Sequence, residues 1–146
     1  MPFGSLTFDS AGNLYGTTGY GGSAGHGTVF QLVPNNGDWS EHVLYSFSGP
    51  DGDRPIAGVT FDLAGNLYGT TADGGSGNCN QQKCGVVFTL SPNGDGTWRE
   101  MTLHSFTGGK DGGAPTAGLA LDSLGNLYGT TQLGGVGIGV VFEFTP

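Results

Sequence analysis

Asp9-Ser-Ala-Gly-Asn-Leu-Tyr-Gly-Thr-Thr18 is the first of three nearly identical stretches in this chain, and their recurrence indicates a repeat fold. The second copy is Asp62-Leu-Ala-Gly-Asn-Leu-Tyr-Gly-Thr-Thr71, and the third is Asp122-Ser-Leu-Gly-Asn-Leu-Tyr-Gly-Thr-Thr131. The copies begin at residues 9, 62 and 122, so the spacing is 53 residues and then 60. A period near ~50 residues is typical of stacked or radially arranged units. A residue that recurs in every unit is therefore expected to serve the fold first.

The composition favours many short strands joined by tight turns. Glycine supplies 31 of the 146 residues, about three times its usual share of ~7%, and charged residues make up only 11%. The glycines follow no Gly-X-Y period and lie between apolar runs, which excludes collagen and a disordered linker. Glycine at this density indicates tight turns.

Each unit divides into four strand signals with apolar residues two positions apart. In the first unit they are Leu6–Phe8, Asn13–Thr18, Gly27–Leu32 (ended by Pro34) and Trp39–Phe47. The second unit repeats them as Val59–Phe61, Asn66–Thr71, Gly85–Leu90 (ended by Pro92) and Trp98–Phe106. The third unit has Leu119–Leu121, Asn126–Thr131 and Gly139–Phe144, with Pro146 after the last. No helical period competes with this pattern.

The predicted fold class is all-β, with β-propeller-like blades of four antiparallel strands and about two and a half to three blades in the chain. A coil of a β-solenoid is usually shorter, and a leucine-rich repeat has its own Leu/Asn spacing. The predicted boundaries are residues 1–54, 55–114 and 115–146, with a cysteine loop at 78–84 in the second unit.

The repeated turn and the repeated tyrosine have a structural and a functional interpretation. Asp followed three residues later by Gly suits a type I turn, so structural turn roles are expected for Asp9, Asn13, Asp62, Asn66, Asp122 and Asn126. Core packing is the default for Tyr15, Tyr68 and Tyr128. An aromatic platform for carbohydrate is the sharper alternative, because sugars stack on exposed rings.

The two cysteines, Cys79 and Cys84, lie in an insertion that only the second unit carries. We expect a disulfide between them and an oxidising compartment. A zinc site is disfavoured because it needs further ligands and no histidine is close in sequence.

The return loops between units are the candidate calcium sites, through Asp51, Asp53 and Asp111. A solvated turn is the competing interpretation, since no complete EF-hand pattern is present and Gly113 replaces Asp53 in the second copy. His26, His42 and His104 form no constellation, and no serine has a base at a suggestive spacing. No catalytic residue is predicted, and the chain is not expected to be an enzyme.

The net charge of the chain limits the kinds of partner that it can bind. The formal net charge is −8, which disfavours nucleic acid. The sequence has no apolar run long enough to span a membrane and no visible signal peptide. We expect the export and anchoring parts to belong to a longer precursor.

The number of units raises the question of closure. A closed propeller typically has about four to eight blades, so fewer than three cannot close a ring. The chain is then a segment of a longer ring, one half of a six-bladed dimer, or a head-to-tail unit of a filament. The uncharged third unit, from Gly134 to Phe142, favours burial against a neighbour, and a tight hairpin is the alternative.

The combined motif resembles a family of bacterial tandem-repeat proteins. Asp-x-x-Gly-Asn-Leu-Tyr-Gly-Thr-Thr, the Gly-Gly loop, Gly-Thr-Val-Phe-x-Leu and Leu-Tyr-Ser-Phe are similar to the GloVer-type, choice-of-anchor repeats, over nearly the whole chain. The resemblance implies exported, often surface-anchored proteins with propeller-like repeats and no assigned catalytic residues. This chain departs from the long arrays of the family in having few copies and no visible anchor.

Together these features predict an extracellular or cell-surface structural protein that associates with copies of itself through its blade edges, as a filament or other homopolymer. The alternative is a propeller module that binds glycans or a protein. Calcium is the one candidate cofactor.

Overall fold

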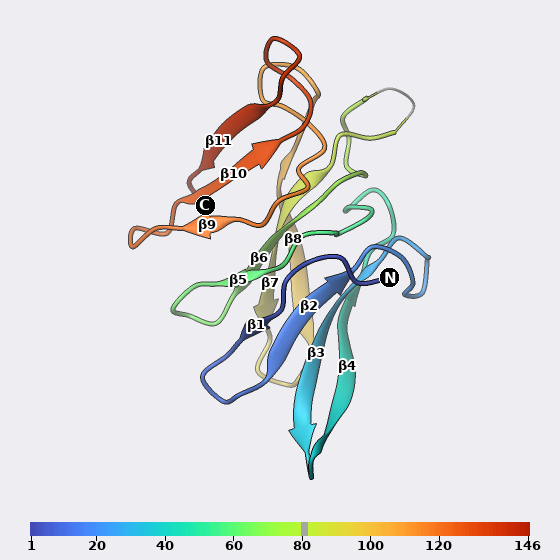
Figure 1. Ribbon diagram of the computed structural model, residues 1–146, viewed down its shortest axis with the longest axis vertical. Coiled ribbons are helices and arrows are strands. Elements are labelled where there is room, and N and C mark those ends of the chain that lie inside the picture. The colour runs from blue at the N-terminus through green and yellow to red at the C-terminus, as the bar shows by residue number, and fades with distance from the viewer. Residues whose placement is uncertain (80–81) are drawn as a thin grey trace.

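The computed structural model describes residues 1–79 and 82–146 (Figure 1). Over these residues the chain is all-β, with eleven strands and no helix. The predicted fold class is confirmed at this level. The strands form three antiparallel sheets of four, four and three strands, and they do not close into a ring within the described residues.

Sheet 1 contains the first four strands in chain order: β1 (Thr7–Phe8), β2 (Leu14–Thr18), β3 (Thr28–Asn35) and β4 (Asp38–Ser46). Sheet 2 repeats this order with β5 (Thr60–Phe61), β6 (Leu67–Thr71), β7 (Val86–Pro92) and β8 (Trp98–Ser105). Sheet 3 consists of β9 (Ala120–Leu121), β10 (Leu127–Thr131) and β11 (Val140–Phe144). Figure 1 shows sheet 2 between the other two.

One predicted boundary is wrong. Strand β3 does not stop before Pro34 but runs through it to Asn35, which pairs with Asp38. The reason lies in the hairpin tip, where Asn36 and Gly37 have φ angles of 50° and 93°. Two such residues make the tight turn whose twist matches paired strands, so the ladder continues to the tip despite the proline.

Every sheet has two different faces, because side chains alternate along a strand. One face, here called the tyrosine face, carries Tyr15 and Val29 in sheet 1. The opposite face, the leucine face, carries Leu14, Phe30 and Leu32. The tyrosine faces of the other sheets carry Tyr68 with Val87 and Tyr128 with Val141, and their leucine faces carry Leu67 with Phe88 and Leu127 with Phe142.

The glycine inside each repeated strand makes room for a phenylalanine ring on the leucine face. A Cβ atom added to Gly69 would lie 2.6 Å from Cζ of Phe88, which is the residue paired with it. The equivalent glycines, Gly16 and Gly129, face Phe30 and Phe142 in the same way. This contact explains why Leu-Tyr-Gly-Thr-Thr recurs with glycine at its centre.

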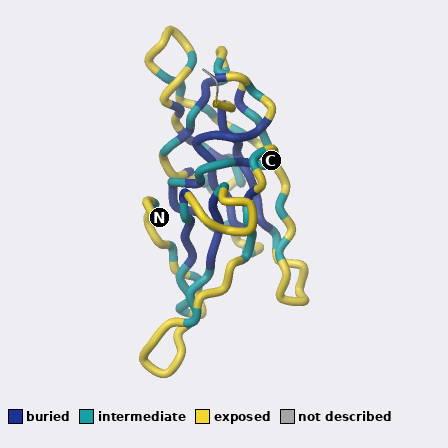
Figure 2. Tube along the Cα trace, turned by 90° about the vertical axis from the view of Figure 1, so that its right-hand side faces the viewer, coloured by how far each residue is buried: buried dark blue, intermediate teal, exposed yellow. Residues whose placement is uncertain are grey.

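The core lies between sheets, where a tyrosine face packs on the leucine face of the next sheet. One cluster joins sheets 1 and 2 and contains Tyr15, Val29, Phe47, Val59, Leu67, Val86, Phe88 and Leu90. A second cluster joins sheets 2 and 3 and contains Tyr68, Cys79, Cys84, Val87, Phe106, Leu119 and Leu127. Figure 2 shows these buried segments in the middle of the molecule and the exposed loops around them.

The segment that leads from one unit to the next is hydrogen-bonded to both sheets. Arg54 donates its N–H to the carbonyl of His26 at 3.1 Å and accepts the N–H of Ala72 at 3.0 Å. Ala114 is bonded in the same way between Cys84 and Gln132. Both residues have left-handed backbones, with φ near 55° and 52°. Over the described residues, no helix is long and apolar enough to cross a membrane.

Candidate functional site

The repeated aspartates are held inside their own turns. Oδ1 of Asp9 accepts the N–H groups of Ala11 and Asn13, each at 2.9 Å. Oδ2 accepts the side-chain amide of Asn13 at 2.8 Å and the hydroxyl of Tyr15 at 3.0 Å. The same four contacts recur at Asp62 and Asp122. These carboxylates are used in closing the turn and in holding the next strand.

The hydrogen bonds of the turn set the ionisation of Asp9 and Tyr15. Burial raises the pKa of Asp9, but the hydrogen bonds from Asn13 and Tyr15 outweigh it and leave the pKa below its ordinary value. Burial and the hydrogen bond to Asp9 raise the pKa of Tyr15. At neutral pH the aspartate is therefore charged and the phenol neutral, which is the state that the turn requires.

The three repeated tyrosines do not form an exposed row. Tyr15 and Tyr68 are buried between sheets, and Tyr128 is half-buried. Tyr15 meets the edge of Phe61 with ring centroids 4.9 Å apart, and Trp98 lies 6.4 Å away. These neighbours leave the ring of Tyr15 no free face on which a sugar could stack.

Asp51 caps the first return loop. Its Oδ1 accepts the backbone N–H and the hydroxyl of Ser48 at 2.8 and 2.9 Å, and its Oδ2 accepts the hydroxyl of Tyr45 at 2.5 Å. Burial and this hydrogen bond raise the pKa of Tyr45 far above its ordinary value. The oxygens of Asp51 are thus already satisfied by protein donors.

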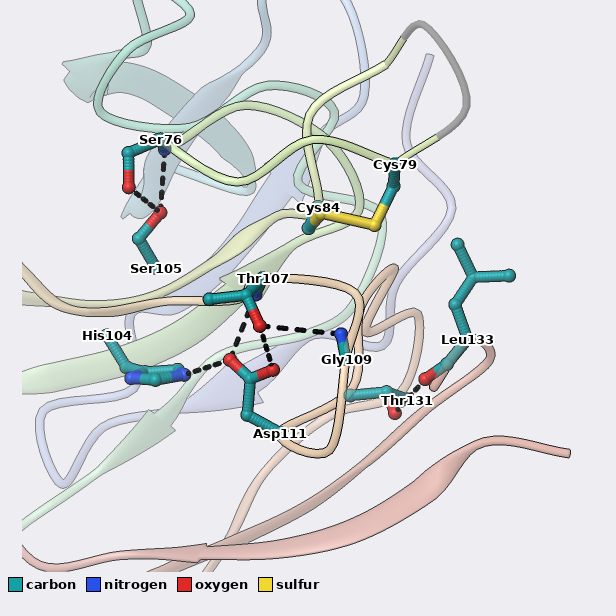
Figure 3. Close-up of polar contacts among 10 residues, drawn as sticks. All are labelled: Ser76, Cys79, Cys84, His104, Ser105, Thr107, Gly109, Asp111, Thr131 and Leu133. Atoms are coloured by element: carbon teal, nitrogen blue, oxygen red, sulfur yellow. Dashed lines mark hydrogen bonds and ion pairs between the residues drawn. A yellow bond between two sulfur atoms is a disulfide. The ribbon is translucent and has the colours of Figure 1, made fainter. Parts of the chain in front are cut away.

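Asp111 caps the second return loop in the same manner (Figure 3). Its carboxylate accepts hydrogen bonds from the backbone N–H of Thr107, at 2.9 Å, and from the hydroxyl of Thr107. Nε2 of His104 lies 3.2 Å from its Oδ2. Among residues 1–79 and 82–146, no three His, Cys, Asp or Glu side chains come together as a metal cluster. Asp51, Asp53 and Asp111, the predicted calcium ligands, lie in two different loops.

Asp53 belongs to a different group of charges, at the loop end between sheets 1 and 2. Nδ1 of His26 lies 3.0 Å from Oδ2 of Asp53, and Nη1 of Arg54 lies 2.7 Å from Oδ2 of Asp73. The backbones of Asp53 and Asp73 are also paired, through hydrogen bonds of 2.9 and 3.0 Å. We call these four residues the loop-end cluster.

A cavity of about 600 Å³ opens beside the loop-end cluster. The exposed side chains of Tyr20, Gln82 and Lys83 line it together with the cluster. With two carboxylates, one guanidinium and one ammonium, the lining has no net charge when His26 is neutral. An aromatic ring beside convergent polar groups is a composition that suits a polar, uncharged ligand.

The disulfide takes the place of this cluster in the second unit. The predicted bond between Cys79 and Cys84 is confirmed, with the two Cα atoms 5.2 Å apart. It packs on the second return loop, where a Cβ atom on Gly113 would lie 3.0 Å from Sγ of Cys79. Figure 3 shows the bond above the loop of Asp111. Asn80 and Gln81 of the predicted loop 78–84 lie outside the described residues.

The two outer sheet faces lack the cover that the inner ones have. On the tyrosine face, Val29 and Val87 are 0% exposed, but Val141 is 77% exposed. On the leucine-face side, Val59 is 4% exposed and its counterpart Leu6 is 49% exposed. Phe8 is 64% exposed, whereas its counterpart Phe61 is partly buried. The same side-chain types therefore form core in the middle of the chain and surface at its two ends.

The comparison with protein-family models gives one match, to the Gloeobacter/Verrucomicrobia repeat, over residues 1–146. The chain belongs to this family. The finding confirms the resemblance inferred from the repeated motifs. A search of the curated proteins and a search of the solved structures found no match.

In a repeat family, a position that departs from the repeat is the better guide to a particular function. The loop-end cluster is such a departure, because the residues in the equivalent positions of the next unit are Cys84, Gly113, Ala114 and Leu133. The backbone pairing is the same in both units, with Gly113 and Leu133 paired as Asp53 and Asp73 are. In the second unit, where the disulfide packs on the loop, this pairing forms without charged side chains. Sequence reasoning missed the cluster because it followed the residues that repeat.

Proposed function

We propose that this chain is a non-enzymatic structural repeat protein of the cell exterior, whose propeller-like sheets associate with further copies into a filament or other homopolymer. The observation that carries the proposal is the pair of outer faces described above. They bear counterparts of residues that are buried at the inner junctions, and Leu6, Phe8 and Val141 on them are exposed. Several exposed apolar side chains on one face can mark an interaction surface.

The free energy available from these faces is consistent with weak, reversible assembly. Burying a Val, Leu or Phe side chain is worth roughly 1.5–3 kcal/mol. Scaled by their exposed fractions of 49%, 64% and 77%, Leu6, Phe8 and Val141 would together contribute about 3–6 kcal/mol. The loss of translational and rotational freedom opposes this with about 4–15 kcal/mol. Association is therefore expected to depend on protein concentration.

Two further features support the location and the role. The disulfide between Cys79 and Cys84 favours an oxidising environment, such as the cell exterior. The recurring carboxylates cap turns, which favours a structural role for them over a catalytic one.

The test is sedimentation velocity of the purified chain over a wide concentration range, followed by negative-stain electron microscopy. We expect species larger than the monomer at high concentration and elongated particles in the images. A folded chain that stays monomeric at every concentration would contradict the proposal.

The second candidate function is binding of an uncharged glycan in the loop-end cavity. The observation that favours it is the charged cluster beside Tyr20, which the second unit does not repeat. Arg54→Ala and Asp53→Gly introduce the residues of the next unit and are the two test variants, with circular dichroism as the check on folding. We expect hits on a glycan array that both variants lose. No hits with the wild-type chain would remove this candidate.

Calcium binding by Asp51, Asp53 and Asp111 is proposed only as an accessory role. Carboxylates and loop carbonyls are the ligands that calcium prefers. Thermal unfolding in calcium and in a chelator tests it: a higher midpoint in calcium supports binding, and equal midpoints oppose it.

A further inference from the structure

We infer that copies of this chain join head to tail, so that the tyrosine face of sheet 3 docks on the leucine face of sheet 1 of a second copy. The register would be the one used at both inner junctions. This inference rests on the proposed self-association and adds the direction, the surfaces and the residue pairs.

The two inner junctions follow one contact rule. The hydroxyl of Thr17 in β2 donates to the carbonyl of Ala57 at 2.8 Å, across the junction of sheets 1 and 2. The hydroxyl of Thr70 in β6 donates to the carbonyl of Ala117 at 3.3 Å, across the next junction. Because two independent junctions share this bond, it is a property of the repeat.

The aromatic contacts follow the same rule. The rings of Phe47 and Phe88 lie 5.0 Å apart across the first junction. The rings of Phe106 and Phe142 lie 5.0 Å apart across the second, with the same interplanar angle of 66°. The direction of packing, tyrosine face onto leucine face, is therefore constant along the chain.

The free faces carry the threonine and the carbonyl of this rule, whereas three-stranded sheet 3 has no counterpart of Phe47 and Phe106. Thr130 occupies the place of Thr17 and Thr70 but is exposed, and the residue in the place of Ala57 and Ala117 is Gly4. The hydroxyl of Thr130 is thus expected to donate to the carbonyl of Gly4 in the second copy.

A proline and a glycine meet at each inner junction and are both present at the ends. A Cβ atom on Gly27 would lie 2.6 Å from Cδ of Pro55, and one on Gly85 would lie 2.8 Å from Cδ of Pro115. The equivalent residues at the ends are Gly139 in sheet 3 and the exposed Pro2 before sheet 1. In the head-to-tail arrangement these two residues meet in the same way.

The aromatic neighbours of Tyr15 also have counterparts at the ends. Tyr15 is covered by Phe61 and Trp98 from sheet 2. Sheet 1 presents Phe8 and Trp39 in the same positions, and both are exposed. They would cover Tyr128 of the neighbouring copy and so rebuild the first junction.

A two-fold dimer would not reproduce these contacts. It would put two leucine faces or two tyrosine faces together, so the threonine would lose its carbonyl and the proline its glycine. A head-to-tail contact instead leaves one free face at each end, which permits an open filament or a ring.

Two complementary variants test the direction. Val141→Asp damages only the face of sheet 3, and Phe8→Asp damages only the face of sheet 1. Both side chains are exposed, so folding should persist, and circular dichroism checks it. Leu63→Asp, at a fully exposed turn in the middle unit, is the matched control and should assemble normally.

We expect each variant alone to be monomeric and the equimolar mixture to form a heterodimer and nothing larger, in sedimentation velocity. The dimer joins the intact face of sheet 1 of Val141→Asp to the intact face of sheet 3 of Phe8→Asp. If the wild-type chain assembles but either variant still dimerises alone, the direction is overturned while self-association stands. If the wild-type chain is monomeric, both proposals fail.

A third variant strengthens the contact instead of breaking it. Glu143 in sheet 3 occupies the place of Gln31 in sheet 1, and its carboxylate accepts the hydroxyl of Tyr128 at 3.2 Å. Glu143→Gln copies sheet 1 and removes a charge from the docking face. We expect assembly at a lower protein concentration, and unchanged or weaker assembly would contradict the docking surface.

Discussion

Sheets 2 and 3 carry nearly the same tyrosine face, but only sheet 2 has a neighbour on it. Tyr68 and Val87 are buried by sheet 3, whereas Val141 remains exposed at the same position of the repeat. The valine and the tyrosine are the same in both sheets, so their difference in burial reflects what packs on the face and not the residue type. A single unit of such a repeat cannot bury its own apolar faces, and stacking completes the core.

The largest expected effect is a difference in stability between the same substitution at the two equivalent valines, Val87 and Val141. Val87→Asp places a carboxylate in a site that is 0% exposed, and we expect it to unfold the chain or to destabilise it by more than about 4 kcal/mol. Val141→Asp should change the stability of the monomer by less than about 0.5 kcal/mol. Urea denaturation at low protein concentration measures both. Equal losses would show that sheet 3 is not a free face.

A second pair compares the repeated glycines. Gly69→Ala puts a methyl group against the ring of Phe88, which is fully buried, and should cost about 1–3 kcal/mol. Gly129→Ala should cost less, because Phe142 is only half-buried and has room to shift. Thermal unfolding ranks the two variants, and the reverse order would contradict the packing described for sheets 2 and 3.

A third change concerns the disulfide, which only the second junction has. Replacing Cys79 and Cys84 by serine removes a short covalent loop, and the expected loss of stability is about 2 kcal/mol. Because the pair packs in the cluster that joins sheets 2 and 3, sheet 3 should lose protection in hydrogen exchange before sheet 1 does. Equal loss in both sheets would argue against a local role.

The smallest effect is the response of the repeated turns to pH. The pKa of Asp62 is lowered in the folded chain from an ordinary value of 3.8, because the hydrogen bonds from Asn66 and Tyr68 outweigh the effect of burial. Its contribution to stability is therefore complete above pH 3.8 and is lost as the pH falls through the lower, folded value. Asp62→Asn should flatten the acid side of the stability profile, and an unchanged profile would contradict the turn role.

The stability at alkaline pH depends on Tyr68, whose hydroxyl donates the hydrogen bond to Asp62. Burial and the contact with Asp62 raise the pKa of Tyr68 above 10.0. The contribution is present below pH 10.0 and is lost as the pH rises through the folded value. Tyr68→Phe should lower the stability below pH 10.0 and flatten its decline on the alkaline side, as measured by urea denaturation across pH. An unchanged alkaline decline would contradict this role of the hydroxyl.

The sequence predicted those parts of the fold that depend on local pattern. Alternating residues such as Leu67 and Gly69 predicted strands. The Asp-x-x-Gly spacing predicted the turns, and the two cysteines in one inserted loop predicted the disulfide. The end of β3 was mispredicted because the tight Asn36-Gly37 turn outweighs Pro34. The loop-end cluster could not be predicted, because Arg54 and Asp73 come together only through the pairing of two units.

We expect the free faces of sheets 1 and 3 to bind further copies of the chain. Sedimentation velocity of the wild-type chain beside Val141→Asp, over the same concentration series, tests it most directly. We expect the wild-type sedimentation coefficient to rise with concentration and that of Val141→Asp to stay at the monomer value. Identical monomer values for both proteins would contradict the account.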